Sequence, residues 1–162
     1  MHILYIHKTF PPQFAHLARA LGRVKGWRST FLSRKPDQVV DGLVNIQYHA
    51  KDEEQRHWQN MFSEHARHAT GVTEALKARP EIRPDLIVAH AGFGSSCFLP
   101  LVRNCPIINY FEYFWNQQKN DMLFRQDWKH PEWYYQLRKV ANAMSLLDLQ
   151  TCASGWWVRR SV

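Results

Sequence analysis

Short apolar runs and helical apolar patterns alternate along the first part of the chain. Residues 3–6 form a continuous apolar run, which is typical of a strand covered on both faces. From Phe14 to Val24, apolar side chains recur every three or four residues, and Gly26 stands where a helix often ends. This order predicts a buried strand, a loop and an amphipathic helix.

The alternation continues along the chain. Further strands are predicted at residues 28–33, 44–48, 85–89 and 106–111. Residues 53–79 carry a long helical pattern, residues 95–103 a short one, and a third helix opens at Pro131. Strands that alternate with helices favour a parallel sheet. We therefore predict one three-layer, Rossmann-like α/β domain with strand order 3-2-1-4-5, and residues 148–153 are a candidate sixth strand.

Length and charge limit the number of domains and the kinds of partner that we expect. The 162 residues, 45% of them hydrophobic, suffice for one domain with a full core. A net charge of +7 favours anionic partners such as sugar nucleotides or phospholipid surfaces. The basic residues form short groups without a dense run, so nucleic acid is not an expected partner.

The cysteines and the absence of long apolar stretches indicate the cellular compartment in which we expect the protein. Three widely spaced cysteines support neither a disulfide framework nor a metal clip. The sequence shows no signal-peptide pattern and no apolar stretch long enough to span a bilayer. We therefore expect a cytoplasmic protein, and any membrane contact is expected to be peripheral and on the inner face.

Polar or glycine-bearing segments follow three of the predicted strands, at residues 7–13, 90–96 and 112–115. Because the carboxyl ends of parallel strands face one crevice, these segments are predicted to converge on a ligand site. Gly92 and Gly94 would let the backbone approach a ligand closely. A strand-to-helix turn capped by a serine, with no ligand, explains the same residues.

Glu112 and the aromatic residues around it allow two interpretations. A carboxylate at the mouth of a buried strand suits hydroxyl binding or acid–base chemistry, but a hydrogen-bonded structural role remains open. The aromatic residues could stack on sugars, enter a lipid interface or fill the core. They are Tyr110, Phe111, Tyr113, Phe114, Trp115, Trp128, Trp133, Tyr134 and Tyr135.

The histidines of the long predicted helix raise the question of a metal. His57, His65 and His68 lie near Glu64, but there is no HExxH spacing, so we interpret them as a solvated helix face and predict no metal. The opposite, packed face is predicted to hold Trp58, Met61, Phe62, Ala66, Ala69, Val72 and Leu76. GxGxxG, Walker and GxSxG motifs are all absent.

Three stretches carry a family resemblance: MHILYIHKTFPPQFAHLARALGRVKG, RPDLIVAHAGFGSSCFLPLVRNCPIINYFEYFW and, more loosely, TCASGWW. Together they resemble the amino-terminal domain of glycosyltransferase family 4, retaining enzymes with two facing Rossmann-like domains. In that family the amino-terminal domain mainly binds the acceptor. The resemblance implies that a carboxy-terminal domain, which would bind the nucleotide-sugar donor, is missing from these 162 residues.

The resemblance also implies site residues and partners. The acceptor-binding residues would be His7, Phe10, Gln13, His90, Gly92, Phe93, Gly94, Glu112 and Tyr113. His90 and Glu112 are the catalytic candidates, and Glu112 stands where many relatives carry a histidine.

No cofactor is expected, and a nucleotide-sugar would be the co-substrate of the full-length protein. The other expected partners are a glycan or lipid-linked acceptor, as in polysaccharide biosynthesis, the missing carboxy-terminal domain and, peripherally, a membrane. The alternative is a non-catalytic Rossmann-like module that pairs with a partner chain.

Overall fold

Strand β1 (His2–Ile6) lies near the middle of a six-stranded sheet in a computed structural model of the chain. The structure describes residues 1–51, 61–93, 95–111, 114–116, 127 and 131–152, and the strand count refers to these residues. Within them, the sheet order is β3-β4-β2-β1-β5-β6.

The parallel part of the sheet matches the sequence-based prediction. Strand β1 pairs in parallel with β2 (Arg28–Ser33) and β5 (Leu86–His90). Outside these pairs, β4 (Leu43–Gln47) joins β2 and β6 (Ile107–Tyr110) joins β5, again in parallel. The predicted order 3-2-1-4-5 corresponds to β4-β2-β1-β5-β6, so the Rossmann-like α/β fold is confirmed.

The sixth strand lies elsewhere than we predicted. It is β3 (Gln38–Val40), which pairs antiparallel with β4 at the edge of the sheet. The two strands are joined by Asp41 and Gly42, both with positive φ, a combination typical of a two-residue hairpin turn. The candidate strand at 148–153 is wrong for its first three residues, since α3 (Glu132–Gln150) continues through them.

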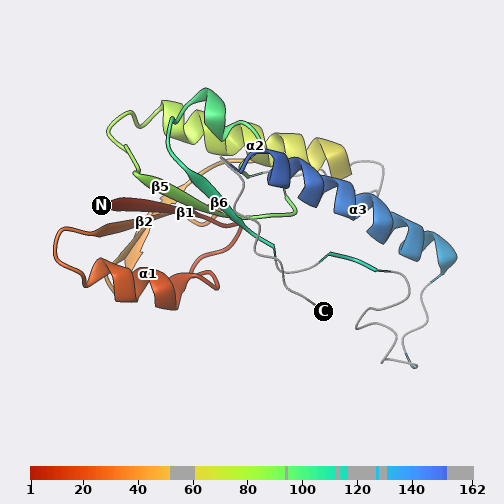
Figure 1. The fold of residues 1–162 in the computed structure, drawn as a ribbon, viewed down its shortest axis with the longest axis horizontal. Helices are drawn as coiled ribbons and strands as arrows, with labels where there is room; N and C mark the ends of the chain where they lie inside the picture. Colours follow the sequence, from red (N-terminus) through yellow and green to blue (C-terminus); the bar gives the residue numbers. More distant parts are fainter. Residues whose placement is uncertain (52–60, 94, 112–113, 117–126, 128–130, 153–162) are drawn as a thin grey trace.

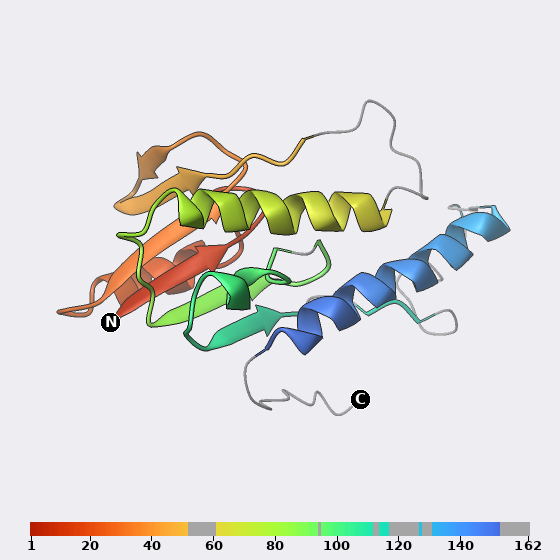
Figure 2. The same ribbon diagram turned by 90° about the horizontal axis from the view of Figure 1, so that it is seen from above.

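The helices form a layer on each side of the sheet (Figures 1 and 2). Helix α1 (Ala15–Gly22) covers one face, while α2 (Met61–Lys77) and α3 cover the other. Alternate residues of β1 reach the two cores, because successive side chains of a strand point to opposite faces. Leu4 and Ile6 pack with α2, and Ile3 and Tyr5 pack with α1.

The face that helix α2 packs against the sheet agrees only in part with the one we predicted. Phe62 is 52% exposed and Ala66 is also exposed. The packed face carries His65 and His68 together with Ala69, Val72 and Leu76. The prediction of a solvated histidine face is therefore wrong for His65 and His68, whereas His57 lies outside the described residues.

The remaining helical predictions vary in outcome. The helix predicted to open at Pro131 is α3. The one predicted over residues 95–103 is reduced to a single 3-10 turn, η2 (Leu99–Leu101). Within the described residues, no helix combines the length and the apolar character needed to cross a bilayer.

Gly71 on α2 lies directly against the backbone of His49. A Cβ built on Gly71 would stand 2.0 Å from the carbonyl oxygen of His49 and 3.2 Å from the ring of Tyr48. We expect Gly71→Ala to lower the free energy of unfolding by about 1–3 kcal/mol, because backbone must move to admit the methyl group. Chemical denaturation measures this change.

Gly22→Ala is the matched control. A Cβ at this position would meet only the hydroxyl of Ser29, at 3.8 Å. The control is therefore expected to be neutral or slightly stabilising. Equal effects of the two substitutions would contradict the close approach of α2 to the chain after β4.

Candidate functional site

Four side chains meet at the carboxyl ends of β1, β5 and β6. The rings of His7 and His90 lie edge to face, with centroids 4.8 Å apart. Phe93, in the turn after β5, stacks on His90 at 5.5 Å, and Tyr110 lies 5.7 Å from His90 on the other strand. We call His7, His90, Phe93 and Tyr110 the histidine–aromatic cluster. Three strands far apart in sequence contribute to it because their parallel carboxyl ends share one edge of the sheet.

Backbone hydrogen bonds fix the two imidazoles in different tautomers. The Thr9 N–H donates to Nδ1 of His7 at 3.0 Å, so this nitrogen carries no proton. Nδ1 of His90 lies 2.8 Å from the carbonyl oxygen of Ala91, which only accepts, so this nitrogen is the donor. In their neutral forms, His7 therefore carries its proton on Nε2 and His90 on Nδ1.

The other predicted site residues occupy different environments. Phe10 is 7% exposed and packs edge-on against Phe31, so it contributes to the core beneath the loop. Gln13 is exposed on that loop. Gly92 has a φ of +99°, which favours glycine, and it forms the turn that carries Phe93. Gly94, Glu112 and Tyr113 lie outside the described residues.

The structure thus brings together the predicted segments after β1 and β5, with Tyr110 at the end of β6 beside them. The acceptor-binding and catalytic roles of the named residues stay predictions.

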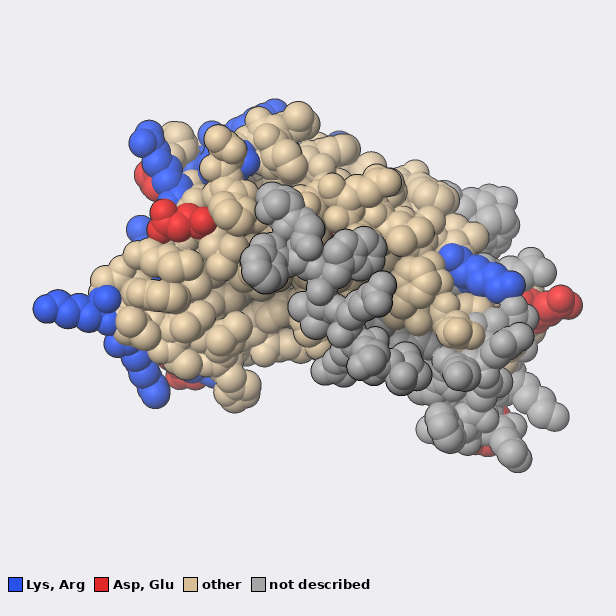
Figure 3. Space-filling model, in the orientation of Figure 1, with Lys and Arg blue, Asp and Glu red and all other residues tan. Residues whose placement is uncertain are grey.

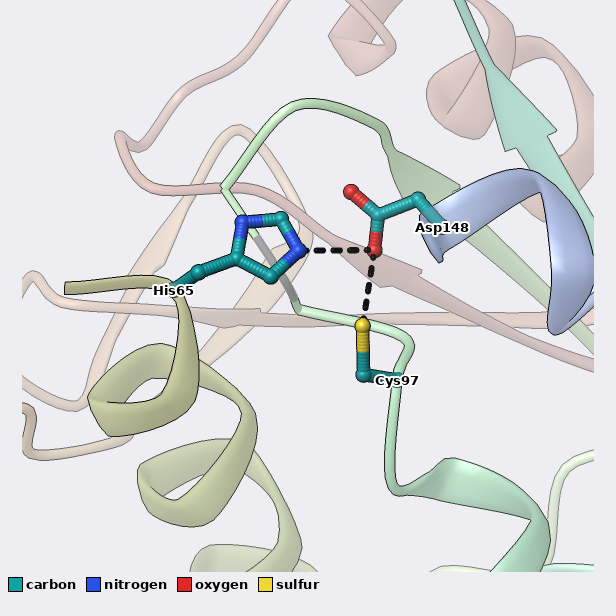
Figure 4. Close-up of side chains that lie close together, drawn as sticks. All are labelled: His65, Cys97 and Asp148. Atoms are coloured by element: carbon teal, nitrogen blue, oxygen red, sulfur yellow. Dashed lines mark hydrogen bonds and ion pairs between the residues drawn. The ribbon is translucent and has the colours of Figure 1, made fainter. Parts of the chain in front are cut away.

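A buried carboxylate on α3 holds the turn that follows β5. Asp148 is fully buried, and its Oδ2 accepts a hydrogen bond of 2.7 Å from the Gly92 N–H. Its Oδ1 accepts one of 2.9 Å from the hydroxyl of Ser96. Figure 4 shows the same oxygen facing His65 of α2 and Cys97 of the segment before η2. The position of Phe93 between Gly92 and Ser96 therefore depends on this side chain.

The backbone of the same residue ties α3 to the sheet. The Asn109 side chain on β6 donates from Nδ2 to the carbonyl oxygen of Asp148, and the hydroxyl of Thr151 donates to that oxygen at 2.7 Å. The thiol of Cys97 points at Oδ1 of the carboxylate from 3.5 Å. Burial, reinforced by the negative charge of Asp148, raises the pKa of Cys97 to about 12.

A buried histidine of α2, His68, lies next to the cluster. His68 is 2% exposed, and its Nδ1 lies 2.9 Å from the hydroxyl of Tyr48. Its ring centroid is 5.6 Å from that of Phe93. Its Nε2 faces Glu64 at 3.7 Å, and Glu64 in turn binds Lys8 at 2.5 Å. Burial, followed by the positive charge of Lys8, lowers the pKa of His68 to about 4.

Sequence reasoning missed the inward position of His65 and His68, although a signal was present. Both lie at helical spacing from Ala69, Val72 and Leu76, which were correctly predicted to pack. Asp148 carried a weaker signal, as a lone acidic residue among leucines. The sequence around Asp148 does not indicate which polar groups its carboxylate binds.

Among the described residues, a group of exposed basic side chains lies away from the cluster. In Figure 3, Lys and Arg side chains gather at the end of the molecule where β1 and β2 begin. Exposed basic residues of this end come from the segments before β2 and β5 and from the end of α2: Arg23, Lys25, Arg28, Lys77 and Arg83. Two basic residues lie at the carboxyl ends of the strands. Arg34 directly follows β2, and Lys8 is the second residue after β1.

A surface hollow of about 760 Å³ lies at the same basic end. Arg23, Trp27 and Arg28 line it, and so does the ion pair between Arg19 and Asp41, 2.8 Å long. It opens beside the starts of β2 and β4. The hollow is therefore at the opposite edge of the sheet from the histidine–aromatic cluster.

Fold and site together define a Rossmann-like α/β domain with a polar and aromatic cluster at the strand ends where such domains bind ligands. A family model described as "Glycosyl transferase family 4 group" matches residues 25–157. Because the match covers most of the chain, the chain belongs to this family group.

The comparison with solved structures supports the same fold. The chain is similar to UDP-GlcNAc 2-epimerase from Neisseria meningitidis, bound to UDP-GlcNAc, with a TM-score of 0.51 and 13% sequence identity. The alignment covers 94% of this chain and 39% of the epimerase chain. At this identity the likeness concerns the fold alone. Comparison with curated proteins gave no significant sequence match.

Asp148→Asn tests the anchoring of the turn. An amide replaces one acceptor oxygen by an NH₂ group, which cannot accept the hydrogen bond of Gly92 or Ser96. Because a buried donor is left unpaired, we expect the free energy of unfolding to fall by about 1–3 kcal/mol. Denaturant titration measures it, with the exposed Glu81→Gln as a control that should match wild type. Unchanged stability of Asp148→Asn would refute the anchoring role.

The buried His68 predicts a pH dependence of stability. The pKa of this histidine is 6.5 in the unfolded chain and about 4 in the folded protein. Acidification between these values therefore favours the unfolded state, by about 3 kcal/mol at most. We expect His68→Gln to lose this part of the decline in stability between pH 6.5 and pH 4.

The measurement is the unfolding free energy at several pH values for wild type, His68→Gln and His16→Gln. His16 is exposed on α1, so its substitution should leave the wild-type decline in place. If the decline is as steep in His68→Gln as in wild type, another group causes it.

Proposed function

We propose that these 162 residues form the acceptor-binding half of a retaining glycosyltransferase. The enzyme would move a sugar from a nucleotide-sugar donor to a glycan or lipid-linked acceptor. The match to the glycosyl transferase family 4 group over residues 25–157 carries this proposal. A second α/β domain outside these residues would bind the donor, in keeping with the family resemblance.

The histidine–aromatic cluster is the proposed acceptor site. Phe93 and Tyr110, the latter 43% exposed, offer ring faces of the kind on which sugar rings stack. With opposite tautomers, His7 and His90 can serve as a donor and an acceptor toward neighbouring hydroxyl groups. The cluster therefore provides both types of contact that a carbohydrate needs.

Catalysis would rest on positioning and on stabilisation of the charge that develops on the leaving diphosphate. Lys8 and Arg34 lie at the same edge of the sheet as the cluster. Lys8 is held by Glu64 at 2.5 Å, which orients its ammonium group. Glu112 stays a catalytic candidate alongside His90, from the sequence.

The second candidate is a non-catalytic module that binds a partner through its aromatic surface. It is favoured by the exposure of Phe111 (37%) and Phe114 (57%) just beyond β6. Such exposed aromatic side chains suit protein contacts as well as sugars. The experiment below separates the two candidates.

The test is sugar transfer by the parent protein, given UDP- and GDP-hexoses with a panel of oligosaccharide and lipid-linked acceptors. We expect transfer with retained anomeric configuration, read by NMR, and no transfer by residues 1–162 alone. His90→Ala should lower kcat/KM at least about tenfold, since it removes a polar contact to the acceptor.

His16→Ala is the matched control, because His16 is exposed on α1 away from the strand ends. Its kcat/KM should equal that of wild type. Binding of a protein partner without any sugar transfer would favour the second candidate. Transfer that is insensitive to His90→Ala would place the acceptor elsewhere.

A further inference from the structure

Three metal-ligating side chains from separate elements converge beneath the turn after β5. His65 comes from α2, Cys97 from the segment before η2 and Asp148 from α3 (Figure 4). Nε2 of His65 lies 3.7 Å from Oδ1 of Asp148, and Sγ of Cys97 lies 3.5 Å from the same oxygen. All three ligand atoms lie within 4.8 Å of one another.

The histidine of this group presents a nitrogen that makes no hydrogen bond within the described residues. His65 is 5% exposed, and its buried Nε2 has no hydrogen-bond partner among the described residues. Burying a polar atom without a hydrogen-bond partner costs free energy, and a bound ion is one of the ways in which that cost is removed. Here the nitrogen faces the Asp148 carboxylate oxygen that the Cys97 thiol also contacts, as Figure 4 shows.

The spacing fits a tetrahedral metal. Zinc binds sulfur at about 2.3 Å and nitrogen or oxygen at about 2.0–2.2 Å, which separates tetrahedral ligands by about 3.3–3.8 Å. The two distances that end on Oδ1 of Asp148 are close to this separation, at 3.5 Å from Cys97 and 3.7 Å from His65, and the third pair, His65 and Cys97, lies within 4.8 Å. Imidazole, thiolate and carboxylate together are ligands that zinc accepts.

We propose that His65 Nε2, Cys97 Sγ and Asp148 Oδ1 bind a divalent transition-metal ion, Zn²⁺ in particular. The ion displaces the proton of the Cys97 thiol to solvent and accepts the lone pair of the thiolate. Its two positive charges balance the thiolate and the carboxylate. The fourth position is left for a water molecule.

The surroundings already orient the carboxylate for this role. The Gly92 N–H holds Oδ2 at 2.7 Å, and the Ser96 hydroxyl lies 2.9 Å from Oδ1. Hydrogen bonds to a ligating carboxylate fix its direction, as in established metal sites. The ion would link α2, α3 and the turn that carries Phe93, and it would act as a structural brace, independent of the sugar-transfer proposal.

The test begins with the full 162-residue chain, purified without chelators or metal-affinity resin. Elemental analysis should find about one zinc ion per chain, in keeping with the one such cluster among the described residues. After removal by chelation, returning Zn²⁺ in large excess over its dissociation constant should raise the melting midpoint by about 5 °C or more. Replacement by Co²⁺ should give a tetrahedral visible spectrum with a sulfur-to-cobalt charge-transfer band.

Matched variants identify the ligands. Cys97→Ser and His65→Gln should lose the bound zinc, and Cys97→Ser should also lose the charge-transfer band. Cys105→Ser and His16→Gln replace the same residue types outside the cluster and should retain both signals.

Two outcomes overturn the site. One is wild-type protein with no zinc and no shift in melting on its addition, which would leave His65, Cys97 and Asp148 as a hydrogen-bonded group only. The other is zinc that disappears in His16→Gln but survives in Cys97→Ser, which would locate the ion on surface histidines. Both measurements on wild type remain valid if a cluster variant fails to fold.

Discussion

The structure around the candidate site depends on one buried carboxylate. Removing a charge from water is costly unless hydrogen bonds replace the lost hydration. Asp148 is fully buried, and Gly92 and Ser96 both donate to its carboxylate. Its own carbonyl group receives the Asn109 side chain. Through this one residue α3 is joined both to β6 and to the turn after β5, so the shape of that turn depends on a residue 56 positions after Gly92.

The turn after β5 lies between the histidine–aromatic cluster and the buried polar residues of α2. It carries Phe93, which stacks on His90 above and contacts His68 beneath. His68 faces Glu64, and Glu64 accepts a hydrogen bond from Lys8, which lies just after the end of β1. The histidine–aromatic cluster therefore contacts a second polar layer through Phe93, which lies against His68. Such contacts help to keep a binding site in one geometry.

Local patterns predicted most of the fold, and they failed where a contact distant in sequence decided the outcome. The five parallel strands and their order followed from apolar runs and from the rules for α/β sheets. The face of α2 was misjudged because His65 and His68, which lack an HExxH spacing, were assigned to a solvated face, while Phe62 was assigned to the packed face. The hairpin of β3 was missed although Asp41 and Gly42 form the usual two-residue turn sequence.

The sequence by itself determined the α/β class, the central position of β1 and the edge of the sheet at which His7 and His90 would meet. These follow from hydrophobic periodicity and from the single hand and direction of parallel crossovers, which are local or general constraints. Only the tertiary structure decided which buried polar groups face one another. Asp148, His65 and Cys97 come from three separate elements, and no local period records that their side chains converge. A buried polar residue is tolerated only if its partners are in place, and those partners are supplied by packing rather than by neighbours in sequence.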